Sequence, residues 1–188
     1  HHRLVGSEMC IRDSYFTKVV MDPRSQNMVR SLFVNMQALS KGARRPKDFD
    51  KYDVKKIGIL GAGLMGAGIA YVTAKAGIEV VLIDMDQAAA EKGKEYSTKI
   101  LDKQLSKKKT TEEKKEKLLS LITPTTDYSL LKGADLIVEA VFENRDIKAD
   151  VTAKAEAQIS ETAVFGSNTS TLPITCLLYT SDAADDLV

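Results

Sequence analysis

Histidine and cysteine are almost missing from this sequence of 188 residues. The two histidines are His1 and His2, so no residue from Arg3 to Val188 can supply an imidazole as a general base. The two cysteines, Cys10 and Cys176, lie near opposite ends of the chain. That spacing argues against a disulfide framework and suits a reducing compartment.

Long apolar runs are missing as well. No stretch approaches the roughly 18 consecutive apolar residues of a membrane span, and the N-terminal HHRLVGSEMCIRDS lacks the apolar core of a signal peptide. A net charge of +1 gives the whole chain no attraction to nucleic acid or membranes. We therefore expect no nucleic-acid partner, no membrane span and no metal site. The 44% apolar content is that of an ordinary globular domain.

Glycine is concentrated in KKIGILGAGLMGAGIAYVTAKAGIEVVLIDMD, residues 55–86. Gly61, Gly63 and Gly66 form G-x-G-x-x-G between an apolar strand pattern and a helix pattern. Gly61 would permit the tight turn, Gly63 would let a pyrophosphate approach the backbone, and Gly66 would let the helix pack closely on the sheet. We expect Gly68 to extend that close packing. The phosphates would then lie at the positive end of the helix.

Asp84 ends the next predicted strand, near the spacing of about 20 residues expected for a ribose-binding acid. A carboxylate there accepts hydrogen bonds from both ribose hydroxyls and repels a 2′-phosphate, which favours NAD over NADP. The alternative is a flexible turn in an unrelated α/β domain, with Asp84 as a surface charge. The predicted cofactor-binding residues of this part are Gly61, Ala62, Gly63, Leu64, Met65, Gly66 and Asp84.

Strand and helix patterns alternate along the rest of the chain. Strands are predicted at 56–60, 79–84, 121–123 (ended by Pro124), 135–141 and 162–168, and helices at 64–76 (ended by Gly77), 87–106, 111–121 and 146–159. This order predicts an α/β fold: a Rossmann-type doubly wound parallel sheet with a helical insertion after the second strand.

A linker helix is predicted ahead of this domain. Apolar residues recur at helical spacing in residues 25–41, with Ser25 as the N-cap and Gly42 as the stop. The polar ARRPKDFDKYD that follows is typical of a linker. VGSEMCIRDS and CLLYTSDAADD continue no neighbouring pattern and resemble translated sequencing-adapter read-through, the alternative being disordered termini.

In order and spacing, GAGLMGAGIAYVTAKAG, VLIDMD, DLIVEAVFEN and FGSNTSTLPI resemble the NAD-binding domain of 3-hydroxyacyl-CoA dehydrogenases across residues 55–175. LDKQLSKKK and YFTKVVMDPRSQNMVRSLFVNMQALSKG further resemble the alpha subunit of multifunctional fatty acid β-oxidation enzymes. In those proteins an enoyl-CoA hydratase domain precedes the dehydrogenase. The resemblance predicts four parts: an artefactual or disordered start (1–14), a linker helix and linker (15–54), an incomplete NAD-binding domain (55–175) and an artefactual or disordered end (176–188).

The resemblance also implies roles for single residues. Glu143 and Lys148 match residues near the nicotinamide ribose and carboxamide, whereas their sequence context alone favours surface charges. Ser170 matches a catalytic serine that contacts the nicotinamide end and the substrate's C3 oxygen, and Ser97 matches a contact to CoA. The family's general base is a histidine in an HFFNP segment beyond SNTS, and this chain has no counterpart.

The resemblance thus implies oxidation of (S)-3-hydroxyacyl-CoA to 3-oxoacyl-CoA with NAD as cofactor. We expect this chain alone to bind NAD weakly and to be inactive. Two alternatives stay open: a stand-alone 3-hydroxybutyryl-CoA dehydrogenase, and a non-catalytic NAD-binding module. The implied partners are the acyl-CoA substrate and a thiolase beta subunit of the parent complex. The implied location is the cytoplasm of a bacterium or the mitochondrion of a eukaryote.

Overall fold

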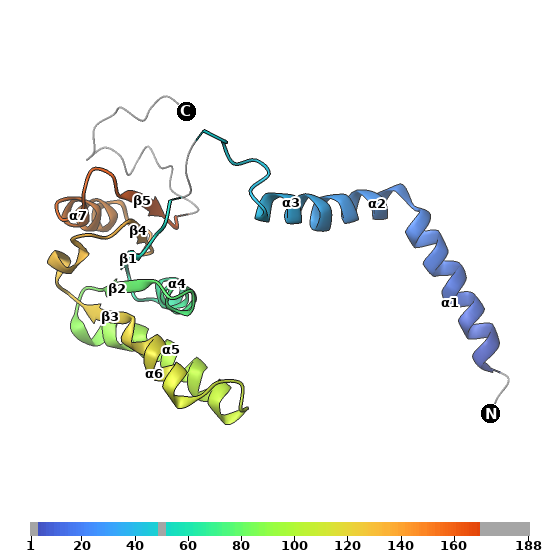
Figure 1. Cartoon of the computed structure of the whole chain (residues 1–188), viewed down its shortest axis with the longest axis horizontal. Helices are drawn as coiled ribbons and strands as arrows, with labels where there is room; N and C mark the ends of the chain where they lie inside the picture. The colour runs from blue at the N-terminus through green and yellow to red at the C-terminus, as the bar shows by residue number, and fades with distance from the viewer. Residues whose placement is uncertain (1–3, 49–51, 170–188) are drawn as a thin grey trace. The chain divides into compact units, whose positions relative to one another are not determined.

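A computed structural model describes residues 4–48 and 52–169 of the chain. The chain divides into two compact units, His1–Tyr52 and Asp53–Val188. Figure 1 labels their α-helices and strands. None of the helices in the described ranges is long and apolar enough to cross a membrane.

The first unit is helical. It contains α1 (Leu4–Met21), α2 (Pro23–Val29), the π-helical η1 (Arg30–Asn35) and α3 (Met36–Ser40). α1 continues through position 14, where the sequence predicted the boundary between an artefactual or disordered start and the linker helix. Whether residues 1–14 are artefactual stays a prediction.

The helix predicted at 25–41 begins earlier, so Ser25 as its N-cap was wrong. Asp22 is the N-cap: its carboxylate accepts the Arg24 N–H at 2.8 Å, and Pro23 fills the first helical position. Gly42, with φ of 77°, follows the last turn as predicted.

The second unit is built on a parallel sheet. Its strands are β1 (Lys56–Leu60), β2 (Glu79–Ile83), β3 (Ile122–Thr125), β4 (Leu136–Glu139) and β5 (Val164–Ser167). They lie in the order β3-β2-β1-β4-β5, and every neighbouring pair is parallel. The chain order reverses between β1 and β4, which is the topological switch point of a doubly wound sheet. The predicted fold class is confirmed.

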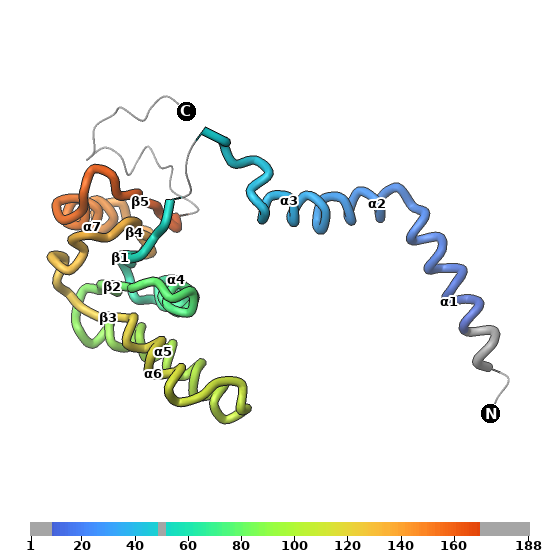
Figure 2. Tube along the Cα trace, viewed as in Figure 1, coloured from blue at the N-terminus to red at the C-terminus, as the bar shows by residue number. Residues whose placement is uncertain are grey.

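Helices cover both faces of this sheet. They are α4 (Leu64–Lys75), α5 (Gln87–Ser106), α6 (Glu112–Ser120), the 3-10 helix η2 (Tyr128–Leu131) and α7 (Arg145–Glu156). In Figure 2 the backbone leaves β2, runs out along α5 and returns along α6 before it enters β3. This hairpin is the insertion that the sequence predicted.

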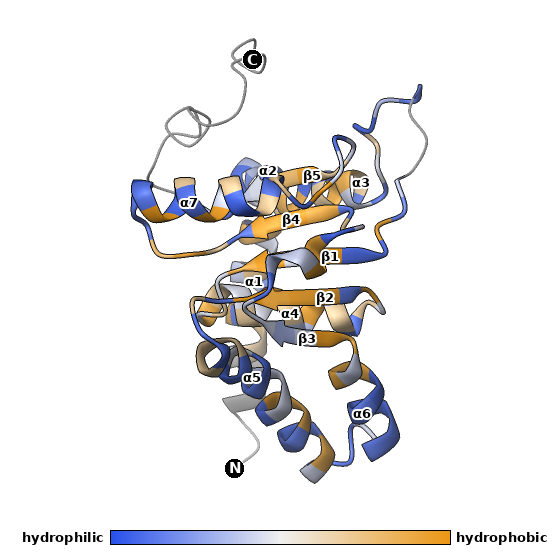
Figure 3. Ribbon diagram, turned by 90° about the vertical axis from the view of Figure 1, so that its left-hand side faces the viewer, coloured by the Kyte–Doolittle hydropathy of each residue, from blue (hydrophilic) through white to orange (hydrophobic). Residues whose placement is uncertain are grey.

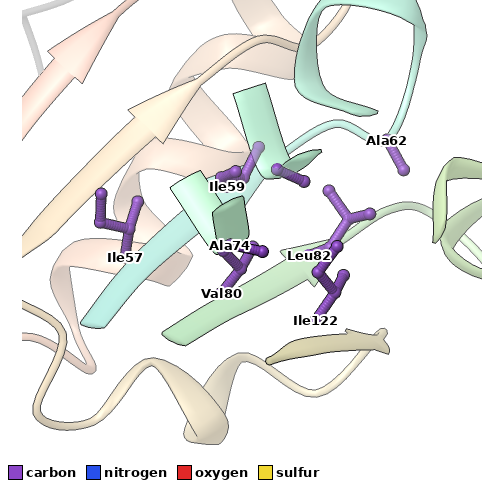
Figure 4. Close-up of a cluster of buried hydrophobic side chains, with 8 residues drawn as sticks. Ile57, Ile59, Ala62, Ala74, Val80, Leu82 and Ile122 are labelled. Carbon is purple, nitrogen blue, oxygen red and sulfur yellow. The ribbon is translucent and has the colours of Figure 1, made fainter. Parts of the chain in front are cut away.

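Alternation along the central strands divides the core between the two faces. Ile57, Ile59, Val80 and Leu82 pack with α4 residues such as Ala74 on one face (Figure 4). Leu60, Val81, Ile83 and Ile137 pack on the other face with Leu131 of η2 and Ala155 of α7. Because both faces of the central strands are buried, β2 and β4 are mostly apolar, as the orange colouring of Figure 3 shows.

The third strand begins one residue later and ends two residues later than predicted. Pro124 was expected to end it, yet β3 continues through Pro124 to Thr125. β3 is an edge strand whose only neighbour in the described sheet is β2. A proline lacks only one ladder hydrogen bond, which an edge position tolerates.

Candidate functional site

The glycine turn, residues 61–66, joins β1 to α4 at the carboxyl edge of the sheet. Gly61 has φ of 96°, and a Cβ there would lie 2.6 Å from the Ala140 carbonyl oxygen. A Cβ on Gly66 would overlap the Gly61 carbonyl oxygen. Neither position has room for a side chain, so the tight turn and the close packing that the sequence predicted are both present.

Gly63 differs from Gly61 and Gly66, because no neighbouring protein atom prevents a side chain at position 63. It is the N-cap of α4, it makes no side-chain capping bond, and a Cβ built on it meets no atom within 4 Å. The first N–H groups of a helix have no intrahelical partner. An open space with free donors at the positive helix end fits a pyrophosphate group. The residues present therefore fit a dinucleotide.

The prediction for Gly68 was wrong. A Cβ on Gly68 would also meet nothing within 4 Å, so this glycine does not extend the close contact between α4 and the sheet. A different close contact, made by a glycine of α5, was missed. A Cβ on Gly93 of α5 would lie 2.6 Å from the Ala62 Cβ and 3.1 Å from Leu82, so α5 packs directly on the glycine turn. A lone glycine inside a helical pattern was the available signal.

Asp84 follows β2 immediately and is half-buried beside the glycine turn. Its Oδ2 accepts the Ala62 N–H at 2.6 Å, and its Oδ1 accepts the Met85 N–H at 2.7 Å. A carboxylate has about four acceptor positions, so each oxygen keeps capacity for a ribose hydroxyl. The side chains of Leu64 and Met65 are exposed on the first turn of α4. The structure thus brings Asp84 and all six predicted turn residues together.

The carboxyl ends of β4 and β5 form a second part of this edge, and its central residue was missed. Glu139, the last residue of β4, is 1% exposed and forms an ion pair with the equally buried Lys148 of α7, with Nζ 2.7 Å from Oε1. The other oxygen, Oε2, accepts a hydrogen bond from Ser167 Oγ at 2.7 Å. An acid inside the apolar run DLIVEAV was the signal for this site.

The remaining predicted residues are not all brought to this edge. Lys148 is enclosed rather than a surface charge, and Glu143 is exposed between β4 and α7. Ser97 is fully buried on α5, and its Oγ has no hydrogen-bond partner within the described residues. In this structure the predicted CoA contact is therefore enclosed and does not reach the surface. Ser170 lies outside the described residues.

The sheet order, the open glycine turn and the acid after β2 define a dinucleotide-binding domain of the doubly wound class. A family model described as the 3-hydroxyacyl-CoA dehydrogenase NAD-binding domain matches residues 56–188, and the chain belongs to this family. Its cofactor is accordingly NAD. The matched range passes position 175, at which the domain was predicted to end; that boundary stays a prediction.

Solved structures agree with this assignment. The chain is 37% identical to (S)-3-hydroxybutyryl-CoA dehydrogenase PaaH1 from Ralstonia eutropha, with a TM-score of 0.64, over 68% of this chain and 45% of that one. It is 35% identical to FadB2 from M. tuberculosis, with a TM-score of 0.64, over 69% and 46%. The dehydrogenase part of multifunctional enzyme 1 from C. elegans shares 30% identity, with a TM-score of 0.58, over 68% and 29%. The chain thus spans less than half the length of each.

Proposed function

We propose that this chain supplies the NAD-binding part of an enzyme that oxidises (S)-3-hydroxyacyl-CoA to 3-oxoacyl-CoA in fatty acid β-oxidation. The observation that carries the proposal is the open space at Gly63 beside an Asp84 already hydrogen-bonded to the same turn. When bound, NAD accepts the hydride from C3 of the substrate. The chain's own residues hold and orient the dinucleotide.

We assign binding of the adenosine half of NAD to Asp84. Its carboxylate is fixed by the Ala62 N–H and retains acceptor capacity for both ribose hydroxyls. A 2′-phosphate would meet this negative charge, which supports NAD rather than NADP as the cofactor. The pyrophosphate is assigned to the N–H groups that follow Gly63.

The nicotinamide half is assigned to Glu143, Lys148 and Ser170 through the resemblance described above. Position supports this for Glu143 and Lys148, because both follow β4, on the far side of the switch point from Asp84. In the sequence, Ser170 is three positions beyond Ser167, the last residue of β5. Ser97 remains a predicted CoA contact.

The α5–α6 hairpin is assigned to the CoA portion of the substrate. Lys115 joins its two helices, with Nζ 2.8 Å from Asp102 Oδ1 and 2.8 Å from Glu112 Oε1. Hydrogen bonds to Asp102 and then Glu112 raise the pKa of Lys115 far above its usual range. The ion pair with Asp102 links α6 to α5 within the hairpin.

The parent enzyme is proposed to be a bifunctional alpha subunit, with a preceding hydratase domain and a thiolase partner. The resemblance of residues 15–41 to a linker helix supports this, as does the similarity to the dehydrogenase part of a multifunctional enzyme. A stand-alone 3-hydroxybutyryl-CoA dehydrogenase is the second candidate, favoured by the 37% identity to such an enzyme. A cytoplasmic or mitochondrial location stays a prediction.

Calorimetric titration of the purified chain with NADH and NADPH tests the proposal. We expect weak binding of NADH and weaker binding of NADPH. In an assay with (S)-3-hydroxybutyryl-CoA and NAD, we expect no turnover by this chain, because no histidine lies between Arg3 and Val188. No binding of either dinucleotide would refute the cofactor site, and measurable turnover would refute the predicted inactivity.

A further inference from the structure

The buried carboxylate of Glu139 is the centre of a cluster formed by Glu139, Lys148, Ser167 and Thr169. Its Oε1 accepts the Val141 N–H at 2.8 Å and the Lys148 ammonium at 2.7 Å. Its Oε2 accepts the Ser167 hydroxyl at 2.7 Å and lies 3.5 Å from Thr169 Oγ1. One side chain thus joins β4, α7 and the end of β5.

The backbone of the same residue strengthens the connection. The Glu139 carbonyl oxygen accepts the Asn168 N–H at 2.8 Å, directly after β5 ends. The Thr169 N–H donates to Ser167 Oγ at 3.1 Å, and the two hydroxyl oxygens lie 2.8 Å apart. The turn that leaves β5 is therefore tied to Glu139 by main chain and side chain together.

This cluster borders the glycine turn. A Cβ on Gly61 would lie 2.6 Å from the Ala140 carbonyl oxygen, so the backbone of the residue after Glu139 touches the turn. A dinucleotide with its adenosine at Asp84 would extend across the switch point, and its second half would be held by residues at the carboxyl ends of β4 and β5.

The ion pair between Glu139 and Lys148 is buried, which bears on how the cluster holds the surrounding segments. Lys148 and Glu139 are each 1% exposed. A buried ion pair adds little to stability relative to apolar residues of the same shape, but it imposes one defined geometry. Here that geometry fixes both segments that lead to the nicotinamide side, the one between β4 and α7 and the one after β5.

We propose that Glu139 is a positioning residue for the nicotinamide half of NAD. It orients the Lys148 ammonium and, through Ser167, the turn that leads to Ser170. This inference rests on the proposed function, because it assumes that a dinucleotide binds along this edge. It assigns Glu139 no contact with the adenosine half.

Comparing NADH with ADP-ribose, which lacks the nicotinamide ring, tests this assignment. In Glu139→Gln, the amide oxygen can still accept from Lys148, but the charge is lost. We expect its NADH affinity to fall about tenfold, the scale of one charge-assisted hydrogen bond, while ADP-ribose binds as in the wild type. Emission from the bound nicotinamide should shift toward that of free NADH.

A matched control and a milder variant accompany this test. Asp150→Asn removes an exposed ion pair with Lys154 on the same helix, and both ligands should bind as in the wild type. Ser167→Ala leaves the Glu139–Lys148 pair intact and removes only the hydroxyl link. It should selectively weaken NADH binding, whereas Ser167→Thr should retain it. If Glu139→Gln does not fold, Ser167→Ala and Ser167→Thr still test whether the cluster positions the nicotinamide half.

The positioning role and the proposed function predict different outcomes. Equal losses of NADH and ADP-ribose affinity in Glu139→Gln, or unchanged NADH affinity in Ser167→Ala, would overturn the positioning role alone. A folded wild-type chain that binds neither ligand would overturn the proposed function, and the positioning role with it.

Discussion

The Ala62 N–H donates a hydrogen bond of 2.6 Å to Oδ2 of Asp84, so the end of β2 holds the glycine turn after β1. The acid expected to bind a ribose therefore also shapes the turn expected to bind the pyrophosphate. One carboxylate couples the two parts of the adenosine site, and a substitution there should affect both recognition and local geometry.

Asp84→Asn separates these effects. The asparagine oxygen can still accept the Ala62 N–H, so the turn should persist, but the negative charge that repels a 2′-phosphate is gone. We expect NADH affinity to fall about tenfold, and the preference for NADH over NADPH to narrow. Calorimetry with both dinucleotides measures this. Glu95→Gln, at an exposed ion pair on α5, is the control. An unchanged preference in Asp84→Asn would contradict the assignment.

Gly63→Ala should weaken NADH binding without unfolding the chain. Its φ of −65° and ψ of −169° are accessible to alanine, and the added methyl meets no protein atom. The methyl would occupy space assigned to the pyrophosphate, so we expect NADH affinity to fall at least about tenfold, with a thermal midpoint close to that of the wild type.

Gly68→Ala is the matched control on the same helix. It also meets no protein atom, and replacing a glycine inside a helix should raise stability by about 0.5–1 kcal/mol. Binding should be unchanged. If Gly63→Ala bound NADH as tightly as Gly68→Ala does, the pyrophosphate would not lie against residue 63.

Gly93→Ala should destabilise the fold, although position 93 lies outside the glycine motif. Its methyl would lie 2.6 Å from the Ala62 Cβ and 2.9 Å from the Ala62 carbonyl oxygen. Part of this contact is backbone, so α5 must shift. Overpacking of this kind costs about 1–3 kcal/mol. Urea denaturation measures it, and a free energy of unfolding equal to that of Gly68→Ala would contradict the packing described here.

The sequence predicted most of the α/β fold because its signals are local. Apolar runs, the glycine turn and Gly77 at the end of α4 located β1, α4 and β2 within a residue or so. Pro124 was misread because whether a proline ends a strand depends on its place in the sheet, and edge positions are set by tertiary pairing.

The site was predicted less completely for a related reason. Gly61, Gly66 and Asp84 follow a motif with fixed spacing, so their arrangement could be inferred from the sequence. Gly93 and Glu139 act through contacts with residues far along the chain, Ala62 and Ser167. Periodicity marks such positions as buried or unusual but does not identify their partners.

Lys148→Met should be strongly destabilising because it leaves the buried Glu139 carboxylate without its counter-ion. Breaking a buried pair from one side costs about 3–5 kcal/mol, whereas replacing both partners is often nearly neutral. We therefore expect Glu139→Gln combined with Lys148→Met to recover most of the loss. Urea denaturation near neutral pH gives the free energies of unfolding.

Lys154→Met serves as the comparison because it breaks an exposed pair with Asp150 on the same helix, and such pairs contribute about 0–1 kcal/mol. A Lys148→Met variant no less stable than Lys154→Met would show that the buried pair does not restrain the fold. Failure of the double variant to recover would show that the unpaired Glu139 carboxylate is not the main cause of the loss. Recovery would assign the loss to the unpaired carboxylate.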